Sequence, residues 1–205
     1  MRRSSQLVVS ATLLAFLGSA CAFGDRHVRL EYPPPGAEAV VAVPASAPLG
    51  ARTVHLGVFV DQRAERGRVG EVRNGWGMHT ADVLAENDVG EWVRAALHQE
   101  LERAGLRVVD DCPAAGGLEV RGEVLRVHCD AYMSYEGEVQ VSAELMRDGK
   151  VLARYPASGK GSAGTNWGAT EKGYAESLAL ALQAAARSLA SEVASGARAA
   201  LPPTP

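Results

Sequence analysis

The sequence predicts an α+β fold, a two-layer sandwich in which a mixed five-stranded sheet carries two long helices on one face. Strand and helix patterns follow one another in the order β-α-β-β-β-β-α, both helices have an apolar stripe, and the folded part is long enough for one core. We expect a single domain over residues 51–197. A signal peptide over 1–20 and a lipid-bearing spacer over 21–50 precede it, and a flexible tail over 198–205 follows.

The N-terminus has the layout of a secretory signal peptide. Arg2 and Arg3 precede an apolar run from Leu7 to Leu17, and small residues lead to Cys21. The run has 11 residues. A membrane-spanning helix needs roughly 20, so we expect cleavage rather than a permanent span.

Residues Leu17-Gly18-Ser19-Ala20-Cys21 resemble the bacterial lipobox. The resemblance implies diacylglycerol on Cys21, cleavage in front of it, and acylation of the new amino group by a fatty acid such as palmitate. Ala22 is not the aspartate that retains such proteins in the inner membrane, so the resemblance implies the periplasmic face of the outer membrane. The alternative is a chance cysteine at an ordinary cleavage site.

The mature chain is acidic, and its first part is rich in proline. Loss of Arg2 and Arg3 leaves 19 basic against 24 acidic residues, a net charge of −5, which argues against nucleic acid as a partner. Prolines between Pro33 and Pro48 predict a semi-rigid tether over residues 22–50. The alternative is a weak strand over Ala39–Val43 that docks on the domain.

A strand, a helix and a second strand open the domain. Alternation from Val54 to Val60 predicts a strand with Val54, Leu56, Val58 and Val60 on its apolar face. A helix begins at Asn87 or Asp88 and ends at Gly105. The short strand Leu106–Asp110 then completes a βαβ crossover, which makes the first two strands parallel.

Three strands and a helix complete the predicted fold. The strands cover 118–130, 136–147 and 150–155, and Asp148-Gly149 predicts a tight hairpin between the last two. A change of apolar phase within the first of them indicates a bulge. A Gly-rich loop over 158–169 leads to a last helix that Thr170 caps.

Short motifs in this order resemble the YajG-like bacterial lipoproteins. The matching residues are Val58–Val60 with Asp61-Gln62-Arg63, Val69-Gly70, the helix Trp92–Ala104 with Gly105, and Thr165-Asn166. The layout also looks like lipoproteins that accompany lipid-transporting ABC systems and like lipid-anchored activators of cell-wall synthases. None of these families is known for catalysis by this domain, so the resemblance implies a binding or assembly part.

No catalytic or metal motif stands out. The five histidines are dispersed, without an HExxH pair. Arg154 occupies the place where a phosphate-binding loop needs glycine, and no serine lies in a G-x-S-x-G turn. We expect no enzyme activity, cofactor or metal. A hydrolase built from distant residues is the least favoured hypothesis.

Five residues are candidates for partner binding. Asp61 and Arg63 end the first strand, Trp76 and Met78 lie in a long loop over 62–86, and Trp167 lies in the last loop. In the alternatives, Asp61 caps a turn while Arg63 pairs with an acid, and Trp76 packs back on the sheet edge. Strand directions place the two loops at opposite ends, so two separate patches are expected.

Cys112 and Cys129 could form a disulfide in the oxidising periplasm. In a simple hairpin, however, Cys129 lies 11 residues beyond Leu118. That is about 36 Å away, against the roughly 6 Å between Cα atoms that a disulfide spans. Both outcomes stay open.

The leading hypothesis is a lipid-anchored periplasmic protein that binds a protein partner in the envelope through its loops or polar sheet face. The alternative is an accessory lipoprotein of a lipid or solute transport system. Such an accessory would hold an apolar ligand between helices and sheet, and would need an unfilled apolar cavity.

Overall fold

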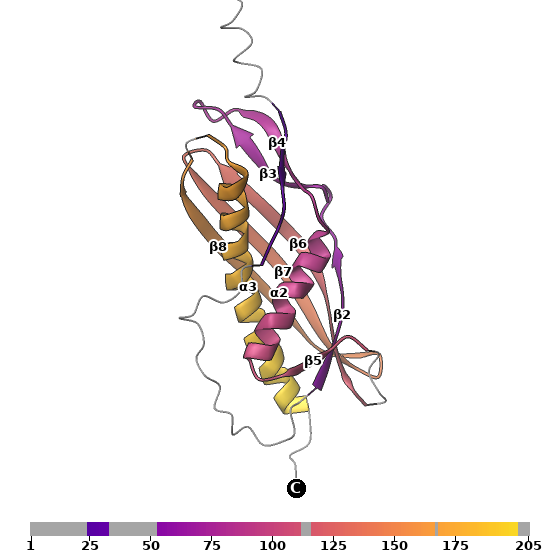
Figure 1. Cartoon of the computed structure of the whole chain (residues 1–205). Helices are drawn as coiled ribbons and strands as arrows, with labels where there is room; N and C mark the ends of the chain where they lie inside the picture. The colour runs from indigo at the N-terminus through magenta and orange to yellow at the C-terminus, as the bar shows by residue number, and fades with distance from the viewer. Residues whose placement is uncertain (1–23, 33–52, 112–115, 167, 201–205) are drawn as a thin grey trace, which may run out of the picture.

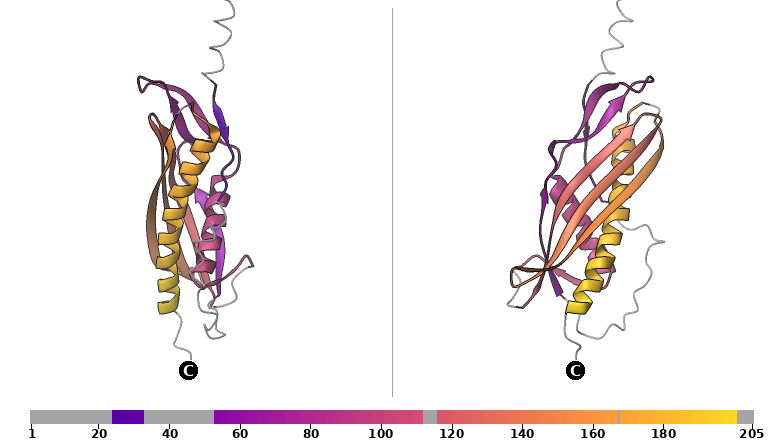
Figure 2. Two further views of the ribbon diagram at one scale, coloured as in Figure 1. Left: turned by 60° about the vertical axis from the view of Figure 1, so that its left-hand side comes forward. Right: turned by 180° about the vertical axis from the view of Figure 1, so that it is seen from behind.

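The computed structural model describes residues 24–32, 53–111, 116–166 and 168–200. Over these residues the strands form one mixed sheet of eight, and both helices cover the same face of it (Figures 1 and 2). The predicted α+β class with a mixed sheet and two helices is confirmed, whereas the predicted five strands are too few. The elements are β1 (Arg26–Val28), β2 (Thr53–Asp61), β3 (Arg68–Arg73), β4 (His79–Ala85), α2 (Val89–Arg103), β5 (Arg107–Val109), β6 (Leu118–Ala131), β7 (Ser134–Arg147), β8 (Lys150–Thr165) and α3 (Glu171–Ala200).

Strand β6 is the centre of the sheet. On one side it pairs with β7, which pairs with β8, both antiparallel. On the other side β2 lies parallel to the first half of β6, and β3 lies parallel to its end. Beyond these come β5, parallel to β2 as predicted, and the pair β4 and β1. The predicted bulge is confirmed as a register shift between Val124 and Arg126.

The helix α2 begins and ends where the sequence predicts. The Asp88 carboxylate accepts the backbone N–H of Glu91 at 2.8 Å, which satisfies a free donor of the first turn. Gly105 follows the last turn with a φ of +84°, a conformation that favours glycine. Helix α3 reaches Ala200, so three residues of the expected flexible tail are helical.

Strand β8 continues through most of the segment predicted to be a Gly-rich loop. A Cβ at Gly159 would lie 2.1 Å from the carbonyl oxygen of Ala181, and one at Gly161 would lie 2.4 Å from that of Ser177. The glycines therefore let α3 approach the strand closely. The loop prediction is wrong for residues 158–165, because glycine here serves packing rather than a turn.

Strand β2 changes face in its middle. Its register with β6 shifts between Leu56 and Phe59, and this irregularity reverses the predicted alternation. Phe59 is buried at 3% exposure, while Val58 and Val60 are 63% and 46% exposed. The prediction that both valines belong to the core is wrong, and they lie on the opposite face of the sheet.

Two segments expected to lack structure form strands. The predicted loop over 62–86 is mostly the β3–β4 hairpin, and residues 24–32, assigned to the spacer, belong to the domain through β1. Val28 and Leu30 are buried in its core. The strand considered over 39–43 lies outside the described residues.

Candidate functional site

The sheet face opposite the helices is not covered by any element that the structure describes (Figure 2). In β7, the side chains of Val139, Val141 and Ala143 are buried under α3. Their neighbours Gln140 and Glu144 lie on the open face. Because α2 and α3 shield only one face, polar side chains from four strands meet on the other.

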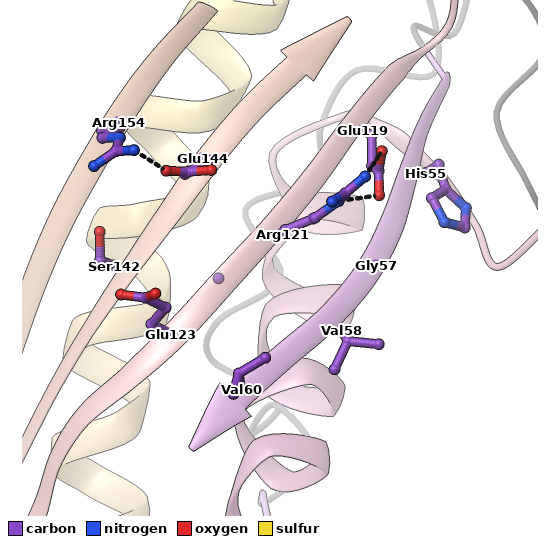
Figure 3. A pocket seen from close by; sticks show the side chains of 11 residues that line it. His55, Gly57, Val58, Val60, Glu119, Arg121, Glu123, Ser142, Glu144 and Arg154 are labelled. Atoms are coloured by element: carbon purple, nitrogen blue, oxygen red, sulfur yellow. Dashed lines mark hydrogen bonds and ion pairs between the residues drawn. The ribbon is translucent and has the colours of Figure 1, made fainter. Parts of the chain in front are cut away.

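A hollow of about 540 Å³ lies on this open face, across β2, β6, β7 and β8 (Figure 3). Its shape depends on Gly57, where a Cβ would lie 3.1 Å from Oε1 of Glu119 and 3.2 Å from Cγ of Arg121. The lining residues are His55, Gly57, Val58, Val60, Glu119, Arg121, Gly122, Glu123, Ser142, Glu144 and Arg154.

Two ion pairs lie in the hollow. Arg121 holds Glu119 through two contacts, Nε to Oε1 at 2.5 Å and Nη2 to Oε2 at 2.9 Å. Arg154 Nη2 lies 2.7 Å from Oε1 of Glu144. The hydrogen bond from Arg121, together with its charge, keeps the pKa of Glu119 below its ordinary value despite partial burial.

Glu123 is left without an ion-pair partner among the described side chains. It lies directly opposite Val60 in the register of β2 and β6. The hollow therefore combines one excess negative charge with two exposed valines, Val58 and Val60. This arrangement fits a partner's lysine or arginine, whose aliphatic stem would cover the valines while its charge meets the carboxylate.

The hollow also contains a hydroxyl and an imidazole side chain, which come from different strands. Ser142 and His55 lie on β7 and β2, with β6 between them (Figure 3). In the described part of the chain, no group of three His, Cys, Asp or Glu side chains could hold a metal ion. The same residues contain no helix long and apolar enough to cross a membrane.

Asp61 and Arg63 form a buried structural pair rather than an exposed contact. Arg63 is 8% exposed; its Nη2 lies 2.8 Å from Oδ2 of Asp61, and its Nη1 donates to the carbonyl oxygens of Arg68 at 2.7 Å and Val127 at 3.4 Å. Burial acts to raise the pKa of Asp61, but the hydrogen bonds and charge of Arg63 outweigh it and lower the pKa. Arg63 thus bridges the place where β6 passes from β2 to β3.

A second exposed surface lies at one end of the sheet. Trp76 is 85% exposed and Met78 57%, so Trp76 does not pack back on the sheet edge. Beside them, in the β6–β7 turn, Tyr132 is 45% and Met133 68% exposed. The Tyr132 hydroxyl donates to the carbonyl oxygen of Gly75 at 3.2 Å and joins the two turns. We call these four residues the tip patch.

Trp167 itself lies outside the described residues, but its neighbour Asn166 shows where the last connection lies. The Asn166 backbone N–H donates to Met133 O at 2.9 Å, and its side-chain amide donates to Ala131 O at 2.7 Å. The prediction of opposite ends is wrong. The prediction assumed that β6 runs antiparallel to β5, but both strands flank β2 and run parallel to it. The directions of β7 and β8 are therefore the reverse of those expected, and β8 ends beside the β6–β7 turn.

Cys129 is the one cysteine that the structure describes, and it is fully buried beneath α3. Its Sγ lies 3.1 Å from the hydroxyl of Ser177, and burial raises the pKa of the thiol to about 12. Cys112 lies outside the described residues, so the disulfide stays a prediction.

The fold has relatives among solved structures, although the sequence matches no known family and no curated protein. Protein XCC0632 from Xanthomonas campestris, of the DUF330 family, superposes with a TM-score of 0.56 at 11% identity, over 85% of this chain and 97% of that one. The chain shares the fold of XCC0632. At this identity the likeness shows the fold alone.

Two further solved structures are similar more loosely. A PelC dodecamer from Paraburkholderia phytofirmans gives a TM-score of 0.37 at 16% identity, over 71% of this chain and 88% of that one. A candidate lipoprotein from Caulobacter crescentus gives 0.39 at 17% identity, over 52% and 83%.

Proposed function

We propose that the protein is a bacterial lipoprotein, anchored through acyl chains on Cys21 at the periplasmic face of the outer membrane, that binds a protein partner without catalysis. In this proposal the signal peptide over 1–20 is removed, and the protein is a member of the YajG-like lipoproteins. The observation that carries the binding role is the hollow on the uncovered sheet face.

Three features of the hollow support a protein partner. Val58 and Val60 are exposed apolar side chains, of a kind that contributes to binding when a partner covers it. The ion pairs of Arg121 and Arg154 are already formed, so a partner need not neutralise them. Glu123 supplies an unpaired charge, which gives orientation and specificity. The partner segment that fits presents a lysine or arginine.

Photo-crosslinking in living cells tests this proposal. A photoreactive residue replaces Val58 in the full chain, and a matched one replaces Ser188 on the exposed side of α3. We expect a discrete protein adduct from position 58 that Glu123→Lys abolishes and Glu192→Lys, a charge reversal on α3, preserves. Adducts that are equal at both positions, or unaffected by Glu123→Lys, would contradict the proposal.

A groove beside α3 supports the alternative of a transport accessory. It has a volume of about 550 Å³, and Ala163, Ala175, Ala179 and Leu180 give it an apolar lining next to Tyr32. If it holds an apolar ligand, a fluorescent fatty acid should bind the purified full chain. Binding should fall in Leu180→Glu and persist in Glu123→Lys. No binding by the native chain would reject this alternative.

A further inference from the structure

We infer that the tip patch, Trp76, Met78, Tyr132 and Met133, rests in the lipid interface of the membrane that carries the Cys21 anchor. The domain would then stand on the bilayer with this end of the sheet, instead of hanging from a spacer. The inference rests on the proposed lipid anchor and adds an orientation and a second membrane contact to it.

The start of the described chain lies close to both the anchor and the tip. Gly24 is three residues after Cys21, a span of about 10 Å at full extension. The Asp25 carboxylate accepts the backbone N–H of Asp82 at 3.0 Å. Strand β1 runs parallel to β4, which begins at the tip turn, so the chain enters the domain at the tip end (Figure 1).

The residues that follow β1 fix this entry point to the core. Leu30 exchanges two backbone hydrogen bonds with the Asn87 side chain, at 2.8 and 3.1 Å. The Tyr32 hydroxyl donates to the buried Glu100 of α2. Because β1 and these contacts hold residues 25–32, the tip cannot move far from a membrane that holds Cys21.

The turns at the tip end are uncharged. Residues 74–78, 131–134 and 166–170 contain no Asp, Glu, Lys or Arg, whereas turns at the other end contain Asp110-Asp111 and Asp148. Tryptophan and tyrosine favour the interface between water and lipid because their rings are apolar and carry one polar group. The chain therefore places apolar turns at the end nearest the anchor.

The arginine that precedes the Trp76 turn is paired. Arg73 Nε lies 3.0 Å from Oδ1 of Asp130, and its Nη1 donates to the carbonyl oxygen of Gly77 at 3.1 Å. Contact with lipid would thus bury no unpaired charge from this arginine, which would otherwise be a large penalty.

The patch is also preformed. The Asn74 side-chain oxygen accepts the backbone N–H groups of Trp76 and Met78, both at 3.0 Å. The Tyr132 hydroxyl joins the β6–β7 turn to the β3–β4 turn, and the Asn166 side chain joins the end of β8 to the β6–β7 turn. The four side chains are exposed on ordered turns, so little conformational entropy is lost when lipid covers them.

Fluorescence quenching by lipid tests the inference directly. The full mature chain, extracted from membranes with its lipid and carrying Trp167→Phe, is placed in phosphatidylethanolamine and phosphatidylglycerol vesicles whose acyl chains are brominated. Trp92, at 4% exposure, is buried inside the protein and serves as the unquenched reference. We expect strong quenching that Trp76→Phe removes and that Met133→Glu reduces several-fold.

The matched control is Leu152→Glu, which puts the same charge on a residue 47% exposed at the far end of the sheet, and should leave quenching unchanged. Normal lipid at Cys21 by mass with no quenching of Trp76 would overturn the tip contact and leave the anchor standing, as would a protein adduct at Trp76 without quenching. A mature chain without lipid would contradict the anchor and the inference together.

Discussion

The Asn87 side chain exchanges two hydrogen bonds with the backbone of Leu30. The Leu30 N–H donates to Oδ1 at 2.8 Å, and Nδ2 donates to the Leu30 carbonyl oxygen at 3.1 Å. The contact joins the segment after Cys21 to the residue in front of the α2 N-cap. Residues that the sequence assigns to a spacer are thereby part of the domain, and any anchor on Cys21 lies close to it.

This contact predicts a loss of stability in Asn87→Ala. The substitution leaves two backbone groups of the buried Leu30 without partners, which should lower the free energy of unfolding by about 1–3 kcal/mol in urea titrations. His27→Ala, an exposed change on β1, should stay within about 0.5 kcal/mol of the native chain. Equal values for the two variants would show that the segment is not fixed.

The bulge in β2 predicts unequal effects at neighbouring positions. The Phe59 ring packs against Gly122, where a Cβ would lie only 2.1 Å from Cε1 of Phe59. Phe59→Ala should therefore lower the free energy of unfolding by about 3–5 kcal/mol, and Val58→Ala by less than about 1 kcal/mol, since Val58 is exposed. A strand without the bulge would give the reverse order.

The Asp61–Arg63 pair predicts a component of acid sensitivity. Arg63 lowers the folded-state pKa of Asp61, so this carboxylate stabilises the fold above its unfolded pKa, about 4. That stability is lost as the pH falls through the lower folded pKa. Asp61→Asn should reduce stability at pH 7 by about 1.5–3 kcal/mol and flatten the loss below about pH 4.

Asp110→Asn is the control for that measurement. Asp110 pairs with Arg94 but its side chain is 65% exposed, and such surface pairs contribute little. The control should keep the acid slope of the native chain, part of which comes from Glu119 and Glu138, whose pKa values are also lowered. Identical pH profiles for Asp61→Asn and the control would contradict the role given to Arg63.

The burial of the Cys129 thiol predicts slow alkylation in the folded protein. With its pKa raised to about 12 and no exposed surface, Cys129 should resist alkylation by iodoacetamide until the protein unfolds. Mass analysis under non-reducing conditions should then find both Cys112 and Cys129 alkylated in denaturant. A mass two hydrogens short, with neither residue alkylated, would instead establish the disulfide.

Local signals were sufficient for some parts of the fold. The sequence predicts both ends of α2, at Asp88 and Gly105, because a helix cap depends only on backbone groups next to it in the sequence. Asp148 and Gly149 form the predicted tight turn, with φ values of 48° and 75° that suit this pair. These features depend on residues adjacent in the sequence, and the structure confirms them.

Other parts depend on contacts between distant residues. Gly159 and Gly161 look like loop residues until α3 is packed against them. Val58 and Val60 continue an apolar alternation that a bulge interrupts, and this interruption is what places the two valines in the hollow on the open face. The parallel pairing of β6 with β2 has no local signal, and from it follows the end at which the last connection lies.

The candidate surfaces were predicted in part for the same reasons. Trp76 and Met78 are exposed, and their glycine-rich turn is a local signal. Tyr132 and Met133 were missed, although an uncharged turn between two long polar-faced strands could have drawn attention to them. Arg63 was named as a candidate contact, but its bond to the carbonyl oxygen of Val127 is visible only in three dimensions.

The central claim is that a lipid on Cys21 holds this domain at a membrane. The most direct test is the intact mass of the protein extracted from membranes of cells that express the full chain. We predict a polypeptide beginning at Cys21 that is heavier than residues 21–205 by a diacylglycerol group and one fatty acyl chain. A chain that begins elsewhere, or one that begins at Cys21 without added mass, would contradict the account.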